Sequence, residues 1–411
     1  MVIFMSYVGL HLDDIKATAL IIGFILALRN IYQIFLRVPL GHFSQMVGRK
    51  PLLITGVSCY SVSLFIMSLA THWGYVFLAI TFVAIGMSCF WPILFAYIGD
   101  VEEDNIGQLQ GRVFQGTDLG IILGGLLAFA LLRRSRVSFL NILTSNFQTL
   151  LFPTERIVPF SPLRILFAWG AGISFIGVIG MAFFMPEVLK QEDKIQVESR
   201  TKALFHSFLT MFPNLIKLTK QKKLSFIYLV QMFIAFLEYM VTAFFPFLVV
   251  TKGFTDDVVA QIAWITAGAL IFFKPYLGKI VDKIGYRVPI FVTLVFSSIM
   301  LILMVVVNSL PWLIVIYILY SASSLTSYIG VNTGTTIESR IAERGIALGA
   351  LGFYVSFARS VSTLGLTPVW ENFGINAVFI TTACIVIVAV ITIYLVYMNN
   401  GKKKKEKDFR M

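Results

Sequence analysis

Four ionisable side chains lie deep inside long apolar stretches of this chain. Each is about ten residues from the nearest polar end of its stretch, which corresponds to roughly 15 Å along a helix. They are Arg29, Asp118, Glu238 and Arg359. A carboxylate at such a depth can take up and release a proton, and an arginine there can bind an anion. Because a charge is expensive in an apolar setting, we expect these residues either to line a polar cavity or to form internal ion pairs that serve only the structure.

Polar and aromatic side chains accompany the four ionisable residues in the same stretches. We assign Asn30, Trp91, Tyr239 and Asn332 to the same cavity, although any one of them could serve packing alone. Four further candidates are Gln33, Gln231, Tyr320 and Tyr328. Two more cations, Arg37 and Lys274, lie nearer the ends of their stretches. We expect this pair to extend toward the membrane surface as anchors, as long cationic side chains do.

Enzyme chemistry finds no support in the residues. The four histidines, His11, His42, His72 and His206, are scattered over loops and cannot form one metal site. There is no phosphate-binding glycine loop followed by lysine and serine or threonine, so ATP-driven chemistry lacks its motif. The three cysteines, Cys59, Cys89 and Cys384, fall inside apolar stretches and look like small buried hydrophobes. We therefore expect no enzyme activity, no cofactor and no metal.

The composition predicts a membrane protein. Of the 411 residues 58% are apolar and only 13% are charged, against roughly 25% charged in soluble domains. Helical spans need roughly 20 apolar residues. The stretches predict eleven of them, at 17–40, 52–71, 74–98, 109–132, 163–185, 224–250, 259–278, 288–308, 311–334, 346–368 and 375–398. The apolar residues Met1–Leu10 cover half a bilayer, so we expect the end of a truncated first helix or, alternatively, a short interfacial start.

The basic residues predict the orientation. The formal net charge is +12, and the excess is concentrated outside the spans. The residues on one side are Arg49, Lys50, Arg112, the linker 190–223, Lys279–Arg287, Arg340, Arg344 and the run Lys402–Lys405. Trp73, Trp312 and Trp370 lie at the opposite ends, where an outer aromatic belt is expected. The positive-inside rule then predicts a multi-pass cell-membrane protein with a cytoplasmic linker and C-terminus, whose basic residues face anionic lipid and not nucleic acid.

Two loops interrupt the regular pattern. The outer segment 133–162 is long and partly apolar, and we expect a short helix on or in the outer interface. Phe205, Phe208, Leu209, Phe212, Leu215 and Ile216 recur at helical spacing in the inner linker, which predicts an interfacial amphipathic helix. The expected organisation is an N-terminal transmembrane half at 1–185, the linker at 186–223, a C-terminal half at 224–398 and a basic tail at 399–411.

A short glycine-framed turn occurs twice, between two membrane-length stretches each time. The first copy is Gly41–Lys50 and the second is Gly278–Arg287. Gly41 matches Gly278 and Gly48 matches Gly285. Glycines permit a tight reversal and a close approach of two helices. The repeat indicates that the chain is built from two similar halves.

Acidic residues end the next helices that reach the same side of the membrane. We expect Arg49 to pair with Asp100, and Arg287 to pair with Glu338 or Asp282. Such exposed pairs contribute roughly 0–1 kcal/mol each, so they would act on conformational balance, or else they only set topology. We call the following set the inner latch: Gly41, Gly48, Arg49, Asp100, Gly278, Asp282, Gly285, Arg287 and Glu338.

The repeated turn resembles the G-x-x-x-D-x-x-G-[RK]-[RK] signature of the major facilitator superfamily. The second copy keeps the aspartate as Asp282, whereas the first has Gln45. The segment Gly116–Gly125 also resembles the G-x-x-x-G-P-x-x-G-G helix of proton-driven antiporters in that family, with Ile121 in place of the proline. Its glycines are Gly116, Gly120, Gly124 and Gly125, and plain helix packing is the alternative explanation for them. The resemblance implies an all-α fold of two six-helix halves related by a pseudo-two-fold axis, with a solute site between them near the midplane.

The expected function is secondary transport of a small solute by alternating access, by a monomer. Asp118 and Glu238 make the proton the expected coupling ion, and Asp118 is the foremost candidate carrier. The antiporter-like helix and the aromatic companions favour efflux of small amphipathic molecules. The deep arginines favour import of small organic anions as the alternative. A non-transporting membrane sensor is the candidate from another class, but the chain contains no large soluble appendage to support it.

Overall fold

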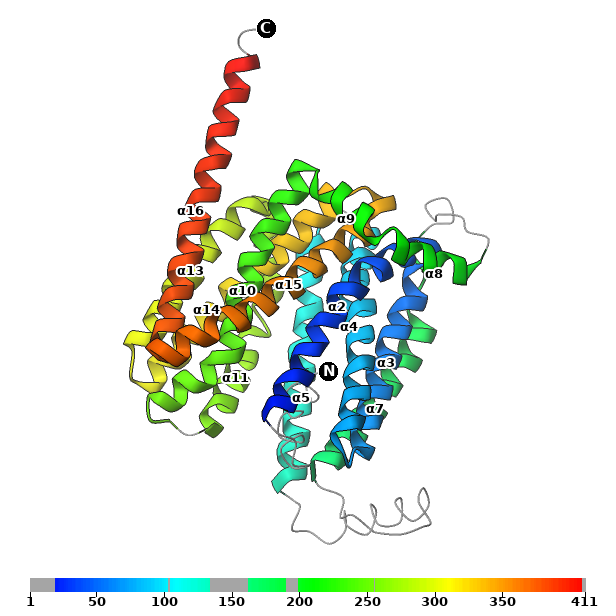
Figure 1. Ribbon diagram of the computed structural model, residues 1–411, viewed down its shortest axis with the longest axis vertical. Coiled ribbons are helices and arrows are strands. Elements are labelled where there is room, and N and C mark those ends of the chain that lie inside the picture. The colour runs from blue at the N-terminus through cyan, green and yellow to red at the C-terminus, as the bar shows by residue number, and fades with distance from the viewer. Residues whose placement is uncertain (1–18, 103, 134–161, 190–198, 255, 409–411) are drawn as a thin grey trace. The chain divides into compact units, whose positions relative to one another are not determined.

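The computed structural model describes residues 19–102, 104–133, 162–189, 199–254 and 256–408. Every regular element in these ranges is a helix, which confirms the all-α prediction (Figure 1). The expected truncated first helix and the outer segment's expected helix fall outside the described residues. The first half contains α2 (Ala19–Val47), α3 (Arg49–Leu69), α4 (Trp73–Val101), α5 (Ile106–Arg133) and α7 (Pro162–Phe184). The second contains α10 (Lys222–Thr251), α11 (Asp256–Leu270), α12 (Lys274–Ile284), α13 (Arg287–Val306), α14 (Leu310–Glu338), α15 (Arg344–Phe373) and α16 (Ile375–Asp408).

Eight described helices are long and apolar enough to cross a membrane: α3, α4, α7, α10, α13, α14, α15 and α16. The other three predicted spans correspond to α2, to α5 and to the pair α11 and α12. The last of these corrects the sequence prediction, because 259–278 was expected to be one helix and is broken after Leu270. Pro275 lies in the first turn of α12, where its missing N–H costs nothing.

The repeated turn is tighter than predicted. Gly41 and Gly278 were expected to open the turn, but α2 continues to Val47 and α12 to Ile284, so both glycines lie inside helices. The chain reverses only at the second glycine of each copy. Gly48 has a φ of 111° and Gly285 has a φ of 82°, which L side chains rarely adopt. The two glycines of each turn therefore have different tasks, reversal for one and helix contact for the other.

The described residues form two compact units. The first contains those of 1–100, 116–211 and 341–352, and the second contains those of 101–115, 212–340 and 353–411. The start of α5 belongs to the second unit, together with α10 to α14, and the start of α15 belongs to the first unit, together with α2 to α4 and α7. These two exchanged segments matter for the inner latch.

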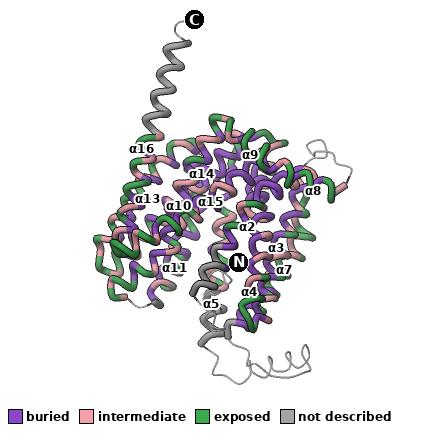
Figure 2. The backbone as a smooth tube through the Cα atoms, viewed as in Figure 1, coloured by how far each residue is buried: buried purple, intermediate pink, exposed green. Residues whose placement is uncertain are grey.

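Each unit has its own apolar core. In the first unit, Leu64 and Met67 of α3, Ile80 of α4 and Phe167 of α7 are buried together. In the second, α13 packs against α14 and α16, and α10 packs against the same two helices. Buried and exposed residues alternate along the helices (Figure 2), and many exposed residues are large hydrophobics. Exposed apolar faces of this kind fit a lipid surrounding.

The linker was predicted to contain one amphipathic helix, and the structure shows two. They are α8 (Arg200–Leu209) and α9 (Met211–Thr219), with Thr210 between them. Leu215 is buried, whereas the other five apolar residues of the predicted pattern are exposed: Phe205, Phe208, Leu209, Phe212 and Ile216. An exposed apolar row beside lysines is typical of a helix at a membrane interface.

Candidate solute site and inner latch

The second unit contains an ion pair between two of the deep ionisable residues. Arg359 Nη2 of α15 lies 3.2 Å from Glu238 Oε2 of α10, and each residue is near the middle of its helix. The guanidinium also lies over the ring of Tyr239, 5.9 Å from its centroid, within the range of a cation–π contact. The side chain of Glu238 is 40% exposed and that of Arg359 is 17% exposed. Both side chains are thus accessible enough for Arg359 to exchange Glu238 for another anion.

Aromatic rings line α10 and α14 in the same unit. The ring of Phe245 lies 4.4 Å from that of Tyr317, which in turn lies 6.1 Å from that of Tyr320. Asn332 is buried, and its amide donates to the carbonyl of Tyr328 one turn earlier. An aromatic surround with few polar groups suits a partly apolar solute.

The first unit contains the other predicted cavity residues. Arg29 and Asn30 of α2 and Asp118 of α5 are all buried. Trp91 of α4 is half-buried, with its ring 5.4 Å from Phe90. The eight predicted cavity residues therefore fall into two groups of four, one in each unit.

Arg37 and Lys274 were predicted to reach out as surface anchors, and this prediction is wrong. Both are buried. Arg37 donates to the carbonyl of Gly352 at 2.7 Å and to the amide oxygen of Gln33. The start of α15 packs on α2, so the Arg37 guanidinium is bound to the Gly352 carbonyl inside the unit and does not extend to a surface.

The inner latch of the first unit is centred on Asp100. Arg49 Nε lies 3.0 Å from one carboxylate oxygen, so the predicted pair is present. Arg344 at the start of α15 lies 2.7 Å from the other oxygen. The pair was expected to be exposed, but the side chains of Arg49 and Asp100 are 0% and 4% exposed. The exchanged segment of α15 covers them, and the energetics of a buried pair apply.

A second carboxylate at this turn was missed from the sequence. Glu187 accepts hydrogen bonds from the backbone N–H groups of Arg49 and Lys50 at the start of α3. A carboxylate at a helix N-terminus satisfies free donors and favours the helix dipole. The only sequence signal was an acid directly after Pro186, at the end of a span.

The residue at the position of the family aspartate accepts backbone hydrogen bonds from the start of another helix in both copies. Asp282 accepts the backbone N–H groups of Gly107 and Gln108 at the start of α5, each at 2.8 Å. Gln45 belongs to α2, and its side chain contacts the start of α15. In the amide orientation that its neighbours satisfy, its oxygen accepts from the N–H groups of Arg344 and Gly345. An amide thus replaces the carboxylate. Burial raises the pKa of Asp282 above its usual range, and the two backbone donors act in the opposite direction.

Glu338 is the acid of the latch in the second unit. Lys223 Nζ lies 2.6 Å from it, the Tyr286 hydroxyl donates to it at 2.8 Å, and Arg287 Nη2 lies 3.6 Å away. Burial raises the pKa of Tyr286 to about 12, so this phenol stays a donor at neutral pH. The predicted pair with Arg287 is present, and the side chain of Arg287 is 43% exposed.

Glycines make two matching helix crossings. A Cβ at Gly41 of α2 would lie under 3.0 Å from the carbonyl oxygen of Gly345 in α15. A Cβ at Gly278 of α12 would lie as close to that of Gly107 in α5. Each crossing joins a turn-forming helix to the start of an exchanged segment. Backbones that approach this closely exclude any side chain.

Plain helix packing was the alternative explanation for the glycines of the antiporter-like helix. A Cβ at Gly116 or Gly120 would meet no atom of the described residues within 4 Å. Gly124 is half-buried, and the side-chain position of Gly125 lies outside the description. The packing explanation for this motif has no support at its first two glycines.

Loss of the Asp100 carboxylate is expected to lower folding stability. Asp100→Asn leaves Arg49 fully buried without its counter-charge, and breaking such a pair costs about 3–5 kcal/mol. Thermal unfolding of the purified protein in detergent measures the effect. Glu338→Gln is the comparison, because the partly exposed Arg287 keeps access to water and the cost is about 0–1 kcal/mol. Equal losses in the two variants would contradict the assignment of a buried latch.

Comparison with known proteins agrees with the family resemblance of the repeated turn. A family model of the Major Facilitator Superfamily matches residues 1–363. The chain belongs to the major facilitator superfamily. Members of this superfamily are multi-pass membrane transporters of small solutes, so the family points to a secondary transporter. No curated protein matches it.

Two solved structures of the superfamily share the fold. The human organic anion transporter MFSD10 (TETRAN) is 14% identical, with a TM-score of 0.72 over 95% of this chain and 89% of its own. The proton:xylose symporter XylE, bound to 6-bromo-6-deoxy-D-glucose, is 14% identical, with a TM-score of 0.64 over 95% of this chain and 91% of its own. At this identity the likeness concerns the fold, and it agrees with the expected arrangement of two helical halves.

Proposed function

We propose that this superfamily member is a proton-coupled transporter of small organic anions. The observation that carries the proposal is the mid-helix ion pair of Glu238 and Arg359 among aromatic rings. Protonation of Glu238 removes the negative partner of Arg359, and the guanidinium is then available to a solute carboxylate or sulfonate. Proton uptake and anion binding thereby favour each other, which is the thermodynamic requirement for coupling. MFSD10, which shares the fold, is an organic anion transporter, and this supports the same solute class.

The inner latch supplies a gate for this site. Asp100, Asp282 and Gln45 hold the starts of α15 and α5 against α2 and α12 through ion pairs and backbone donors. We propose that these contacts form in one transport state and separate in the other. By the distribution of basic residues, the latch, the linker and the C-terminus face the cytoplasm of a cell-membrane protein that acts as a monomer.

A second candidate is proton-coupled efflux of small amphipathic molecules. The observation that favours it is the aromatic group on α4, where the ring of Trp91 lies 5.4 Å from Phe90 and 5.9 Å from Phe95. Such rings stack on apolar or cationic solutes. The buried Arg29 and the half-buried Arg359 make a cationic solute the less favourable choice.

Flux in proteoliposomes tests the two candidates together. The purified chain is reconstituted with an imposed pH gradient, and uptake of aromatic carboxylates is compared with that of amphipathic cations and of neutral molecules of equal size. We expect gradient-dependent accumulation of the carboxylates alone. Accumulation of the cations instead would transfer the assignment to the exporter. Binding without flux of any solute would favour the sensor and contradict both transport proposals.

A further inference from the structure

A basic cavity of about 790 Å³ lies at the latch end of the second unit. It is formed where the end of α9 meets the start of α10, the turn before α13 and the middle of α16. Four cationic side chains line it: Lys220, Lys222, Lys223 and Arg287. This cavity is separate from the aromatic group around Glu238, and the transport mechanism above does not use Lys220 or Lys222.

The charge of this basic cavity is not balanced by the protein. Glu338 takes contacts from both Lys223 and Arg287. Lys220 and Lys222 are exposed, and neither forms an ion pair with a carboxylate of the described residues. Four cations against one carboxylate leave three positive charges. An anionic group, such as the phosphodiester of a lipid head group, is the chemistry that this arrangement fits.

The floor of the basic cavity is apolar. The apolar residues of its lining are Phe226 and Leu229, about one and two turns after Lys222 on α10, and Ile393 of α16. Lys222 begins α10, a helix that is long and apolar enough to cross a membrane. The cations therefore lie at the level of the membrane surface, and the floor lies toward the hydrocarbon. An apolar floor contributes nothing to the binding of a free anion, whereas it binds the apolar part of an amphiphile.

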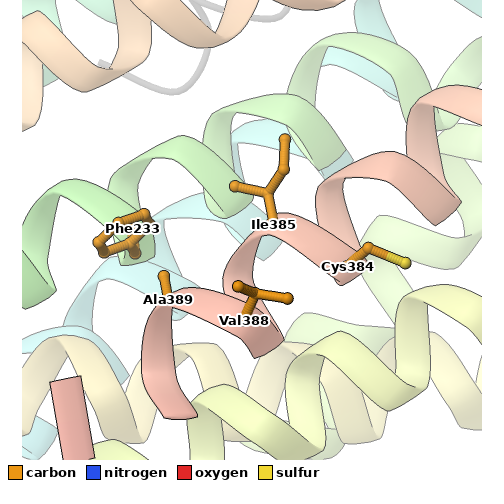
Figure 3. Close-up of a pocket in the computed structure, with 5 residues that line it drawn as sticks. All are labelled: Phe233, Cys384, Ile385, Val388 and Ala389. Carbon is orange, nitrogen blue, oxygen red and sulfur yellow. The ribbon is translucent and has the colours of Figure 1, made fainter. Parts of the chain in front are cut away.

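A second hollow continues along the same two helices. It measures about 470 Å³ and is lined by Phe233, Cys384, Ile385, Val388 and Ala389 (Figure 3). Phe233 is four residues after Leu229 on α10, and Ala389 is four residues before Ile393 on α16. Four residues are about one helical turn, so this apolar groove follows the basic cavity along one seam between α10 and α16.

We propose that the seam between α10 and α16 binds one anionic phospholipid. Its phosphate lies among Lys220, Lys222, Lys223 and Arg287, and one acyl chain lies in the groove beside Phe233. Basic pockets between helices at the cytoplasmic side suit anionic head groups, because that leaflet carries the anionic lipids. The phosphate shares Lys223 and Arg287 with Glu338, so lipid occupancy also acts on the latch of the second unit.

Lipid binding to the full chain tests this assignment. Native mass spectrometry of the detergent-purified protein compares phosphatidylglycerol with phosphatidylcholine of identical acyl chains. We expect phosphatidylglycerol to bind more tightly, and the double variant Lys220→Gln, Lys222→Gln to weaken it about 30-fold. The matched control is Lys279→Gln, Lys283→Gln, which removes two exposed lysines of α12 outside the cavity and should leave binding unchanged. Equal binding of the two lipids, or equal losses in both double variants, would overturn the proposal.

A groove variant distinguishes the lipid from free phosphate. Ala389→Phe fills the groove and should weaken phosphatidylglycerol binding, and Val388→Phe provides a second variant at a more exposed position. Each variant is first checked for a monodisperse profile in size-exclusion chromatography. Inorganic phosphate and glycerol phosphate serve as competitors without acyl chains, and we expect neither to displace the lipid at equal concentration. Displacement by phosphate together with no effect of either groove variant would show a phosphate site and refute the lipid site.

Discussion

Replacing Glu238 by glutamine is expected to abolish transport driven by a pH gradient, while exchange of solute for solute continues. The amide resembles the protonated acid and cannot carry a proton, and it leaves Arg359 available to the anion. The accumulation ratio at a fixed gradient should therefore fall to about one, because a step that no longer moves a proton cannot draw on the gradient. Solute counterflow in proteoliposomes, measured at zero pH gradient, should proceed near the rate of the unaltered protein.

Arg359→Lys is the companion variant. Lysine keeps the positive charge but loses the planar fork that holds a carboxylate with two hydrogen bonds. We expect weaker binding of the anion and an intact response to pH. Asp118→Asn is the control for the other deep acid, which is buried. If Glu238→Gln still accumulates solute and Asp118→Asn does not, the proton is carried by Asp118 and the ion pair in the second unit is structural.

Gly111→Ala is expected to open the crossing between α5 and α12. The added methyl group would lie under 3.0 Å from the backbone carbonyl oxygen of Lys274, and a backbone cannot move aside as a side-chain tip can. Overpacking of this kind costs about 1–3 kcal/mol, which shifts the balance between closed and open inner ends about 5- to 150-fold. The alkylation rate of a cysteine introduced at Gln108, beside the crossing, should rise accordingly.

Gly116→Ala is the matched control for this effect. It lies on the same helix, and its added methyl group would meet no atom of the described residues within 4 Å. Alanine is the better helix former by about 1 kcal/mol, so this variant should be neutral or more stable. A similar rise in alkylation in both variants would mean that helix propensity, and not the close crossing, controls the opening.

The sequence by itself determined the class of the protein and its repeated construction. Apolar stretches of membrane length force helices, because a backbone in lipid must satisfy its own hydrogen bonds. The copies at Gly41 and Gly278 then revealed two halves, and local spacing was enough to predict the contacts of Arg49 with Asp100 and of Arg287 with Glu338. These are properties of short segments and of their order along the chain.

The tertiary structure decided the environment of those contacts. The starts of α5 and α15 pack within the unit of the opposite half, which buries Arg49 and adds Arg344 as a second partner of Asp100. The same packing places the Arg37 guanidinium against the Gly352 carbonyl. It also lets the Gln45 amide accept the backbone hydrogen bonds that an aspartate accepts in the second copy. The pairing of Glu238 with Arg359 likewise joins residues of two helices far apart in the chain. No local pattern records these arrangements, because burial and partner choice depend on which helices meet, and that is set by the packing of the whole chain.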